Sequence, residues 1–518
     1  MKYLPLDLST FSTMMTENYV YVDKTEHIYR LFSGGSRLYF FARPRRFGKS
    51  LLISTLKELF LGNRELFKGL WIDSSNYQWV KHPVIHLDFA NIGHETPEDL
   101  KKNLSHHLHK IALEYNIDLS SAPTVQAELN DLIKQLAQTN KVVILIDEYD
   151  KPILDHISDL EKANSMRKTI AGMYDTIKSM DAYIRAIFVT GVTKFAKTSI
   201  FSGMNNLNDI SFDKQSAQLL GYTQEELIHY FTPYIDSISK SENRSAEEVL
   251  ADMKQWYNGY RFSELPTRVY NPFSIMYYLS KGKLTNYWFK SGTPTFLIHL
   301  IKKQYIDLEQ IPTAAIKSDY LDTFEIDNIP LIPLLFQTGY LTIDEYNLKN
   351  NKVTLKYPNY EIEESFTKHI VLSLADTTTT NVETITDRLI TALERHNFDS
   401  FCSTLKSLFS RIPYSIRINK ESYYHSLFQF LMNLLVLETH SEVMTHDGRI
   451  DTVIQTDKHI YIFELKVNKT EQEALDQIEH KKYYEGYKIF NKPITLVGLS
   501  FSTHDENLDI THTAKNMF

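Results

Sequence analysis

The stretch Arg43-Pro44-Arg45-Arg46-Phe47-Gly48-Lys49-Ser50 decides the fold, because it separates two segments of different periodicity. Residues 37–42 (Arg-Leu-Tyr-Phe-Phe-Ala) have the composition of a buried strand, and residues 49–61 have the spacing of a helix. A strand that turns through Gly-Lys-Ser into a helix is typical of a phosphate-binding loop. The stretch therefore predicts an α/β domain with a parallel sheet.

Three residues of this loop have the chemistry that a nucleoside triphosphate requires. Gly48 lets the backbone approach the phosphates, Lys49 supplies a charge for the β- and γ-phosphates, and Ser50 supplies a hydroxyl for magnesium. We count Arg46 as a further nucleotide-binding residue, beside the positive end of the helix. Arg43 replaces the usual first glycine, so an exposed basic turn is the alternative interpretation.

A second strand ends in two carboxylates. The apolar, β-branched run at residues 141–146 is typical of a strand that is buried on both faces. Asp147 follows it and would hold magnesium through water, and Glu148 would orient or deprotonate the attacking water. An acidic turn at a strand end is the alternative, but a phosphate loop about a hundred residues earlier favours the hydrolase. Asp150 is a weaker, supporting candidate.

The next strand, at residues 187–190, ends in a polar turn. Thr190 or Thr193 could sense the γ-phosphate from this place, although a plain turn fits equally well; we favour Thr190 as the nucleotide-binding residue. Arg185 and Arg261 are candidates for stabilising charge, but ordinary surface arginines are the favoured interpretation. Strands that alternate with helices indicate right-handed crossovers in one sheet.

Five segments in order resemble a known family. They are residues 21–25 (Tyr-Val-Asp-Lys-Thr), 43–50, 145–150, 201–210 and 256–261 (Trp-Tyr-Asn-Gly-Tyr-Arg). They look like the bacterial AAA-ATPase-like family, whose members commonly carry a PD-(D/E)XK nuclease-superfamily domain at the C-terminus. The resemblance implies ATP binding. It also implies that an arginine at position 43 is usual in the phosphate loop of that family.

A new pattern begins near residue 421: amphipathic helix, strand, turn, strand, helix, strand. It predicts a separate, small α/β domain. Residues 448–454 are expected to form a strand that leaves an Asp447-Gly448 turn, and residues 460–467 its hairpin partner. Alternation along the second strand puts Glu464 and Lys466 on one face.

Asp451, Glu464 and Lys466 are expected to form a magnesium site on these strands. The two carboxylates would bind one or two ions that activate water, and the lysine would position the water or the phosphate. Asp…Glu-x-Lys resembles the PD-(D/E)XK motif, and a structural ion pair is the alternative. The neighbouring candidates are Glu421 or His425 as extra ligands, Gln477 and Tyr483 on the following helix, and His440, His446 and His459, for which a structural or exposed role is favoured.

The chain of 518 residues is expected to form three parts. These are an AAA-like P-loop ATPase domain (1–286), a mainly helical connector or lid with a hairpin-like section at 340–357 (287–413), and a small restriction-endonuclease-like domain (414–518). The single cysteine, Cys402, excludes an intrachain disulfide and a cysteine zinc cluster. Neither a signal peptide nor a membrane-length apolar run is present, so a cytoplasmic protein is expected.

The favoured hypothesis is a protein that binds and hydrolyses ATP and is coupled to a magnesium-dependent nuclease. Nucleic acid, DNA rather than RNA, is the expected partner, and with a net charge of −8 it would need a local basic surface. A different class remains open, an ATPase switch in signalling or assembly whose C-terminal domain binds but does not cut. A transporter or chaperone motor is weaker, because nothing indicates a membrane or a peptide channel. The formation of homo-oligomers is left open.

Overall fold

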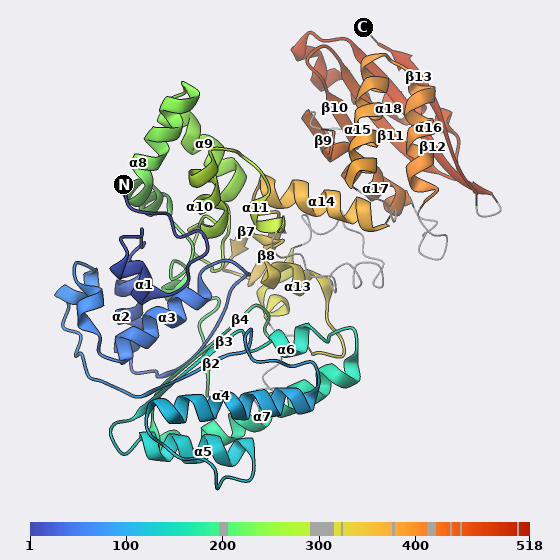
Figure 1. Ribbon diagram of the computed structural model, residues 1–518. Coiled ribbons are helices and arrows are strands. Elements are labelled where there is room, and N and C mark those ends of the chain that lie inside the picture. The colour runs from blue at the N-terminus through green and yellow to red at the C-terminus, as the bar shows by residue number, and fades with distance from the viewer. Residues whose placement is uncertain are drawn as a thin grey trace. The chain divides into compact units, whose positions relative to one another are not determined.

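The computed structural model describes residues 1–195, 206–290, 315–322, 325–374, 379–411, 421–435, 438–445, 448–504 and 507–517. Internal contacts divide the chain into two compact units, 1–296 with 312–362 and 297–311 with 363–518 (Figure 1). The region 287–413, predicted as one connector, is thus shared between the two units by its contacts. Its role as a lid stays a prediction.

A five-stranded sheet in the order β2-β3-β4-β1-β5 forms the centre of the first unit. All its pairs are parallel. The register sets Ala42 opposite Gly191 and Asp88 opposite Asp147, so the carboxyl ends of β1 to β4 lie along one edge of the sheet. The strands are β1 (Leu38–Ala42), β2 (Val84–Asp88), β3 (Val142–Asp147), β4 (Ile184–Gly191) and β5 (Asn208–Asp209).

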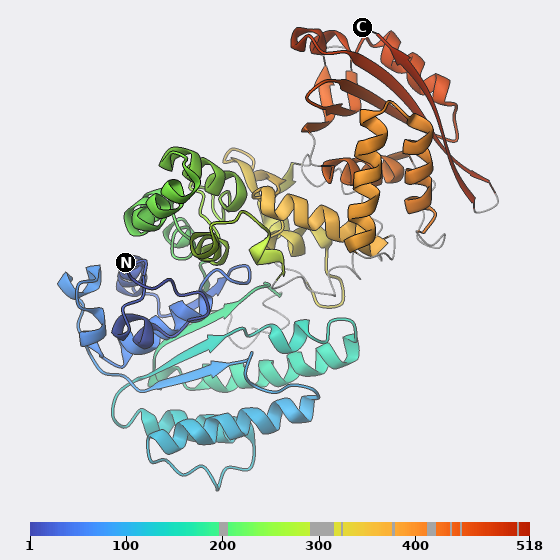
Figure 2. The ribbon, with the colours of Figure 1, turned by 45° about the horizontal axis from the view of Figure 1, so that its top comes forward.

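Helices flank this sheet, as Figure 2 shows. Helix α3 packs on β2, β3 and β4, and α4, α5 and α7 pack on one another. Strands β1 and β3 are buried along their whole length, which explains their unbroken apolar sequences. The helices are α1 (Phe11–Thr16), α2 (Thr25–Ser33), α3 (Lys49–Phe60), α4 (Pro97–Glu114), α5 (Val125–Leu136), α6 (Lys151–Leu154) and α7 (Leu160–Ser179).

The rest of the first unit combines helices with a small sheet in the order β6-β8-β7. Strands β7 and β8 pair antiparallel, which confirms the predicted hairpin-like section. Helices α8, α9 and α10 share an apolar core with Val20 and Val22 of the N-terminal segment. The elements are α8 (Gln224–Glu242), α9 (Ala246–Tyr257), α10 (Pro272–Lys281), α11 (Tyr287–Lys290), β6 (Ile316–Lys317), α13 (Leu331–Thr338), β7 (Thr342–Asn347) and β8 (Lys352–Lys356).

The second unit holds a mixed sheet in the order β13-β12-β11-β10-β9. Only β11 and β12 are parallel among these pairs, and α18 forms the crossover between them. The predicted pairing of β10 with β11 is confirmed, whereas β9 and β13 were not predicted. The strands are β9 (Glu438–Thr445), β10 (Gly448–Gln455), β11 (Ile460–Val467), β12 (Ile494–His504) and β13 (Asn507–Asn516).

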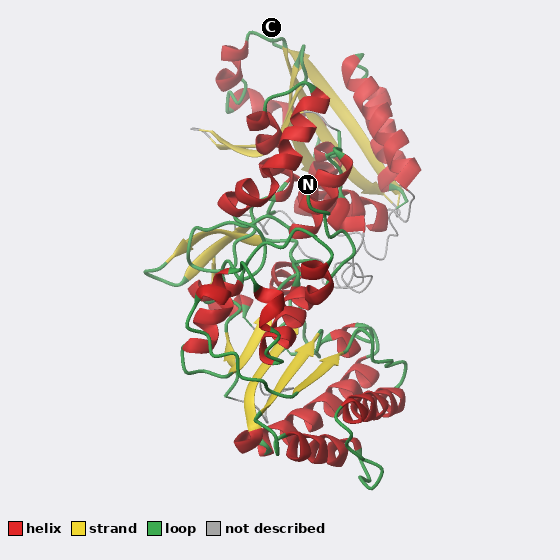
Figure 3. Ribbon diagram, turned by 60° about the vertical axis from the view of Figure 1, so that its left-hand side comes forward, coloured by secondary structure: helices red, strands yellow, loops and turns green. Residues whose placement is uncertain are grey.

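The helices of this unit cover its sheet, and Figure 3 separates helices and strands by colour. Contacts join α16 to β13, α17 to β9, β10 and β11, and α18 to β11 and β12. The helices are α14 (Tyr360–Leu374), α15 (Thr379–Glu394), α16 (Phe398–Phe409), α17 (Glu421–Asn433) and α18 (Glu471–His480), and α14 begins in the first unit. Among all the described helices, none is both long enough and apolar enough to cross a membrane.

Candidate functional sites

The turn between β1 and α3 has the backbone of a phosphate loop. Gly48 has a φ of 93°, in the left-handed region that favours glycine, and α3 begins at the next residue. The side chain nearest to an added Cβ is an ordinary contact at 3.8 Å, so the backbone angle, not space, requires glycine here. Arg46 also has a positive φ, 66°, which is uncommon for a residue with a side chain. The free N–H groups of the first turn of α3 lie at this loop.

The ammonium of Lys49 lies inside the loop. It donates hydrogen bonds to the carbonyl oxygens of Arg43 and Pro44, both at 2.9 Å. Burial lowers the pKa of Lys49, and the nearby carboxylate of Glu148 opposes that shift. A buried cation with several N–H donors suits the β- and γ-phosphates of a nucleotide.

The two carboxylates after β3 lie beside the loop. Asp147 is buried and accepts a hydrogen bond of 2.5 Å from the hydroxyl of Thr190, at the end of β4. Glu148 is partly exposed, with a φ of 52°. Burial raises the pKa of Glu148, while the charge of Lys49 lowers it. The structure thus brings together the predicted residues at the ends of β3 and β4.

Asp150 holds the turn that follows β4. Its carboxylate accepts hydrogen bonds from the backbone N–H of Val192 (3.0 Å) and from the N–H and hydroxyl of Thr193 (2.7 and 2.6 Å). Burial raises the pKa of Asp150, and the bonds from Thr193 oppose this. The hydroxyl of Thr193 is therefore committed to Asp150, whereas that of Thr190 is next to Asp147.

Arg43 is a structural residue of the loop, a role that its sequence position did not indicate. Its guanidinium donates to the carbonyl oxygens of Ser211 (2.7 Å) and Ser216 (3.2 Å). It lies between the rings of Phe41 and Phe262, 4.4 and 4.3 Å from their centres. Burial lowers the pKa of Arg43 to about 9. The arginine thus fixes the loop through contacts far away in the sequence.

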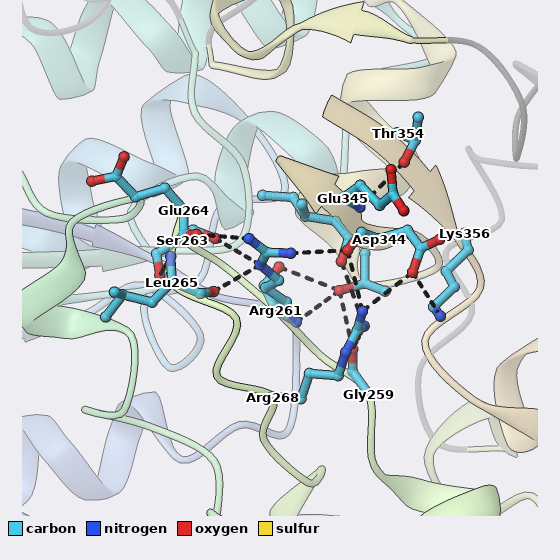
Figure 4. A network of polar contacts seen from close by, with 12 residues as sticks. Gly259, Arg261, Ser263, Glu264, Leu265, Arg268, Asp344, Glu345, Thr354 and Lys356 are labelled. Carbon is cyan, nitrogen blue, oxygen red and sulfur yellow. Dashed lines mark hydrogen bonds and ion pairs between the residues drawn. The ribbon is translucent and has the colours of Figure 1, made fainter. Parts of the chain in front are cut away.

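Arg261 has a similar structural role (Figure 4). The side chain is 7% exposed, so its interpretation as a surface arginine is wrong. The guanidinium of Arg261 instead donates hydrogen bonds to backbone oxygens. The neighbouring Arg268 donates hydrogen bonds to the carbonyl oxygen and the carboxylate of Asp344. The carbonyl acceptors of Arg261 are those of Ser263, Glu264, Leu265 and Asp344. These hydrogen bonds attach the end of the Trp256–Arg261 motif to β7.

The other arginine considered as a source of stabilising charge, Arg185, is partly exposed on β4.

A charged cavity of about 450 Å³ opens at the loop. Its charged and polar lining includes Arg45, Arg46, Lys49, Ser50, Glu148 and Lys151. A small apolar cavity of about 60 Å³ shares Gly48, Leu51, Tyr222 and Pro272 with it. A charged space bordered by apolar side chains has the character that the phosphates and the base of a nucleotide require.

The second unit contains the other predicted site. The carboxylate of Asp451, on β10, accepts a hydrogen bond of 2.8 Å from the backbone N–H of Leu465, on β11. The ammonium of Lys466 lies 3.1 Å from Glu464 Oε1, and the side chains of both residues are buried. Two carboxylates and one lysine therefore meet at adjacent strands, as the alternation predicts.

Two flanking helices contribute to this site. His425 of α17 lies with Nε2 3.4 Å from Asp451 Oδ1, and Gln477 of α18 donates a hydrogen bond to Glu464 Oε1. Burial, with the charge of Asp451, raises the pKa of Glu464 to about 8, and Lys466 opposes the shift. The other oxygen of this carboxylate, Oε2, is buried and has no hydrogen-bond partner among the described residues.

A magnesium ion fits this donor set. No group of three or more His, Cys, Asp or Glu side chains that could hold a metal occurs in the described part of the chain. Magnesium, however, commonly takes one or two carboxylates and keeps water and phosphate as its other ligands. The free Oε2 of Glu464 beside Asp451 matches this demand.

The remaining candidates are structural or lie outside the described residues. Tyr483 is buried in the apolar core of the second unit. His459 bonds Thr495 at 2.7 Å, and burial lowers its pKa to about 4. The side chains of Glu421 and His440, the whole of His446 and Asp447, and residues 201–205 of the 201–210 motif are outside the described part.

The sheet and its phosphate loop define a P-loop ATPase fold, and the mixed sheet defines a nuclease fold. Residues 5–201 match the model of a predicted AAA-ATPase, and residues 419–509 match the PD-(D/E)XK nuclease superfamily. An uncharacterized protein in the vnfD 5′ region of Azotobacter chroococcum mcd 1 is 34% identical over 514 residues, which cover 97% of this chain and 96% of the relative. The chain belongs to this bacterial AAA-ATPase-like family and carries the nuclease-superfamily domain at its C-terminus. The predicted family and fold class are confirmed.

Among solved structures, the ORC2 protein of Aeropyrum pernix in ADPNP and ADP complexes matches over 65% of this chain and 87% of its own. The sequence identity is 11% and the TM-score 0.18. This likeness is too weak to carry an argument about the fold or the site.

Proposed function

We propose that the chain binds and hydrolyses ATP in its first unit and that this ATPase controls a magnesium-dependent nuclease in its second unit. The observation that carries the proposal is the convergence of Lys49 and Glu148 on one charged cavity beside the loop. Family membership supports both halves. DNA rather than RNA is the proposed substrate, and the cleavage assay compares the two.

At the first site, Lys49 would bind the β- and γ-phosphates and Arg46 would add charge at the mouth of the loop. Ser50 and Asp147 would hold magnesium, which neutralises phosphate charge. Thr190 would keep the Asp147 carboxylate in place through their hydrogen bond. Glu148 would orient the attacking water or take its proton, and its raised pKa favours proton acceptance near neutral pH.

At the second site, Asp451 and Glu464 would hold magnesium, which supplies an activated water and stabilises negative charge. Lys466 would place its ammonium against the scissile phosphate or the water. Gln477 would orient the Glu464 carboxylate through its hydrogen bond. His425, with Nε2 3.4 Å from Asp451 Oδ1, would restrain Asp451 by an ion pair when its imidazole is protonated.

One observation favours a second candidate, an ATPase switch whose nuclease-fold domain only binds. The 3.1 Å pair of Glu464 and Lys466 is also the arrangement of a structural ion pair. We nevertheless prefer cleavage, because a structural pair does not explain the neighbouring Asp451. We also propose a cytoplasmic location, which suits the single unpaired cysteine.

The experiment is a cleavage assay on the full chain with end-labelled single- and double-stranded DNA and RNA. Magnesium is present or replaced by EDTA, and ATP, a slowly hydrolysed ATP analogue or no nucleotide is added. Magnesium-dependent cleavage that responds to ATP supports the proposal. ATP hydrolysis without cleavage of any substrate would favour the switch.

A further inference from the structure

The phosphate loop is bonded to a tryptophan of the later part of the first unit. Trp288 Nε1 donates a hydrogen bond of 2.9 Å to the carbonyl oxygen of Arg45. Next to it, Pro44 packs on Gly339, where an added Cβ would come within 2.7 Å of the proline ring. Trp288 is 3% exposed and its ring meets that of Tyr340. Pro44 and the backbone of Arg45 are therefore in contact with this later segment.

The same tryptophan is bonded to the first turn of α14. Its backbone N–H donates a hydrogen bond of 2.6 Å to Glu361 Oε1, and the hydroxyl of Ser274 donates one of 2.7 Å to Glu361 Oε2. Glu361 is completely buried. A buried carboxylate that lost these donors would be strongly destabilised, so Trp288 and Glu361 are expected to move together.

Further contacts fix the start of α14. Asn359 donates to the carbonyl oxygen of Asn258 (2.8 Å) and accepts from the N–H of Ile362 (3.2 Å), as an N-cap residue does. Gly259, with a φ of 109°, packs so closely on Pro358 that a Cβ would lie 1.8 Å from its carbonyl oxygen. These residues belong to the first unit, whereas the rest of α14, from Glu363, belongs to the second.

We propose that Trp288 and Glu361 couple the phosphate loop to α14, so that nucleotide binding alters the helix that leads into the nuclease unit. This inference rests on the proposed ATP site. Phosphate oxygens compete with the carbonyl groups of Arg43 and Pro44 for the Lys49 ammonium. When these carbonyl groups shift, the adjacent carbonyl of Arg45 shifts with them and displaces Trp288, which is bonded to it. Trp288 in turn displaces Glu361 in the first turn of α14.

The test compares two Trp→Phe substitutions in the full chain. Trp288→Phe keeps an aromatic ring but removes the N–H that bonds Arg45. Trp256→Phe is the matched control. Trp256 also contacts the start of α14, with its ring centre 4.7 Å from that of Tyr360, but among the described residues it makes no hydrogen bond to the loop. Glu361→Gln is a second variant, which keeps the shape of the side chain but removes its charge.

Two quantities are measured with magnesium and a slowly hydrolysed ATP analogue: the affinity for the analogue and the hydrogen exchange of the α14 backbone. We expect the analogue to slow exchange in wild type and in Trp256→Phe. Trp288→Phe should lose this response and bind the analogue about fivefold more weakly, the effect of one hydrogen bond. Glu361→Gln should lose most of the response, and ATP should no longer change cleavage by either variant.

The outcomes separate this inference from the proposed function. A wild-type chain that does not bind the analogue overturns both. If wild type binds it but the exchange of α14 stays unchanged, only the coupling is overturned. The coupling also fails if Trp288→Phe and Trp256→Phe respond alike. Thermal denaturation of each variant shows whether it is folded. If Trp288→Phe does not fold, the exchange response of Glu361→Gln tests the coupling instead.

Discussion

The guanidinium of Arg43 lies 4.3 Å from the centre of the Phe262 ring, although more than two hundred residues separate them. This contact explains why the loop has an arginine where other phosphate loops have glycine. The arginine binds the loop to Phe262, which directly follows the Trp256–Arg261 motif, and to the 211–216 segment.

Restoring the usual glycine should therefore harm the protein. Arg43→Gly removes a buried side chain and leaves backbone carbonyls without donors, at a cost of about 2–4 kcal/mol in the free energy of unfolding. Urea denaturation followed by fluorescence measures it. Arg64→Ala, which breaks an exposed ion pair with Asp73, is the control and should change little. A stable variant with improved ATP binding would contradict the structural role.

Lys49→Ala should reduce ATP affinity about 100-fold or more, because it removes the charge-assisted contact with the phosphates. Isothermal calorimetry on the full chain provides the measurement. Lys57→Ala lies on the same helix, outside the cavity, and serves as the control. Wild-type affinity in the Lys49 variant would remove the loop from nucleotide binding.

Glu148→Gln should keep ATP binding and slow hydrolysis by about 10²–10³-fold, since the amide cannot accept the proton of the water. Turnover at saturating ATP is the quantity to follow. If it is unchanged, another residue is the base. Asp150 is next in line, but its carboxylate already accepts three hydrogen bonds from Val192 and Thr193.

Lys466→Ala should leave ATP binding intact and slow magnesium-dependent cleavage by about 10²–10³-fold through lost charge stabilisation. Glu464→Ala should act differently and weaken metal binding itself. Lys469→Ala, an exposed lysine just beyond β11, is the matched control for the loss of a positive charge. Equal cleavage by wild type and Lys466→Ala would exclude this lysine from the mechanism.

Metal binding at the second site should depend on pH. Because the pKa of Glu464 is raised to about 8, the carboxyl group holds a proton at lower pH that the metal must displace. The apparent magnesium affinity should therefore rise by up to about tenfold per pH unit from pH 6 and level off above pH 8. Calorimetry in buffers of different ionisation enthalpy should show the release of about one proton. An affinity that is independent of pH would place the metal away from Glu464.

The sequence was sufficient where a pattern is local. The buried strand before Asp147, the turn through Gly48 into α3, and the alternation that pairs Glu464 with Lys466 all depend on near neighbours. The predictions were incomplete where a partner is distant. Arg261 is buried because it packs against β7, some eighty residues later in the chain. No periodic pattern of residues near Arg261 indicates this contact.

The same reason explains the residues that were not predicted at all. Trp288 and Glu361 are single residues in segments without a motif, and their bonds to Arg45 and to each other arise only from packing. Gly339 follows an apolar segment, and a glycine in that place commonly ends a helix. Its contact with Pro44, however, could not be predicted from the sequence. The assignment of roles at both sites stays a prediction until the variants are measured.

Because α14 is one continuous helix of 15 residues that starts in the first unit and ends in the second, the proposed coupling depends on the phase of the residues within this helix. A flexible linker tolerates insertions, but one residue added within a helix turns everything after it by about 100° around the helix axis. Family members that share the coupling should therefore conserve the length of this helix more strictly than its sequence. Deletions or insertions here would interrupt the proposed path from Glu361 along α14 without altering a residue of either site.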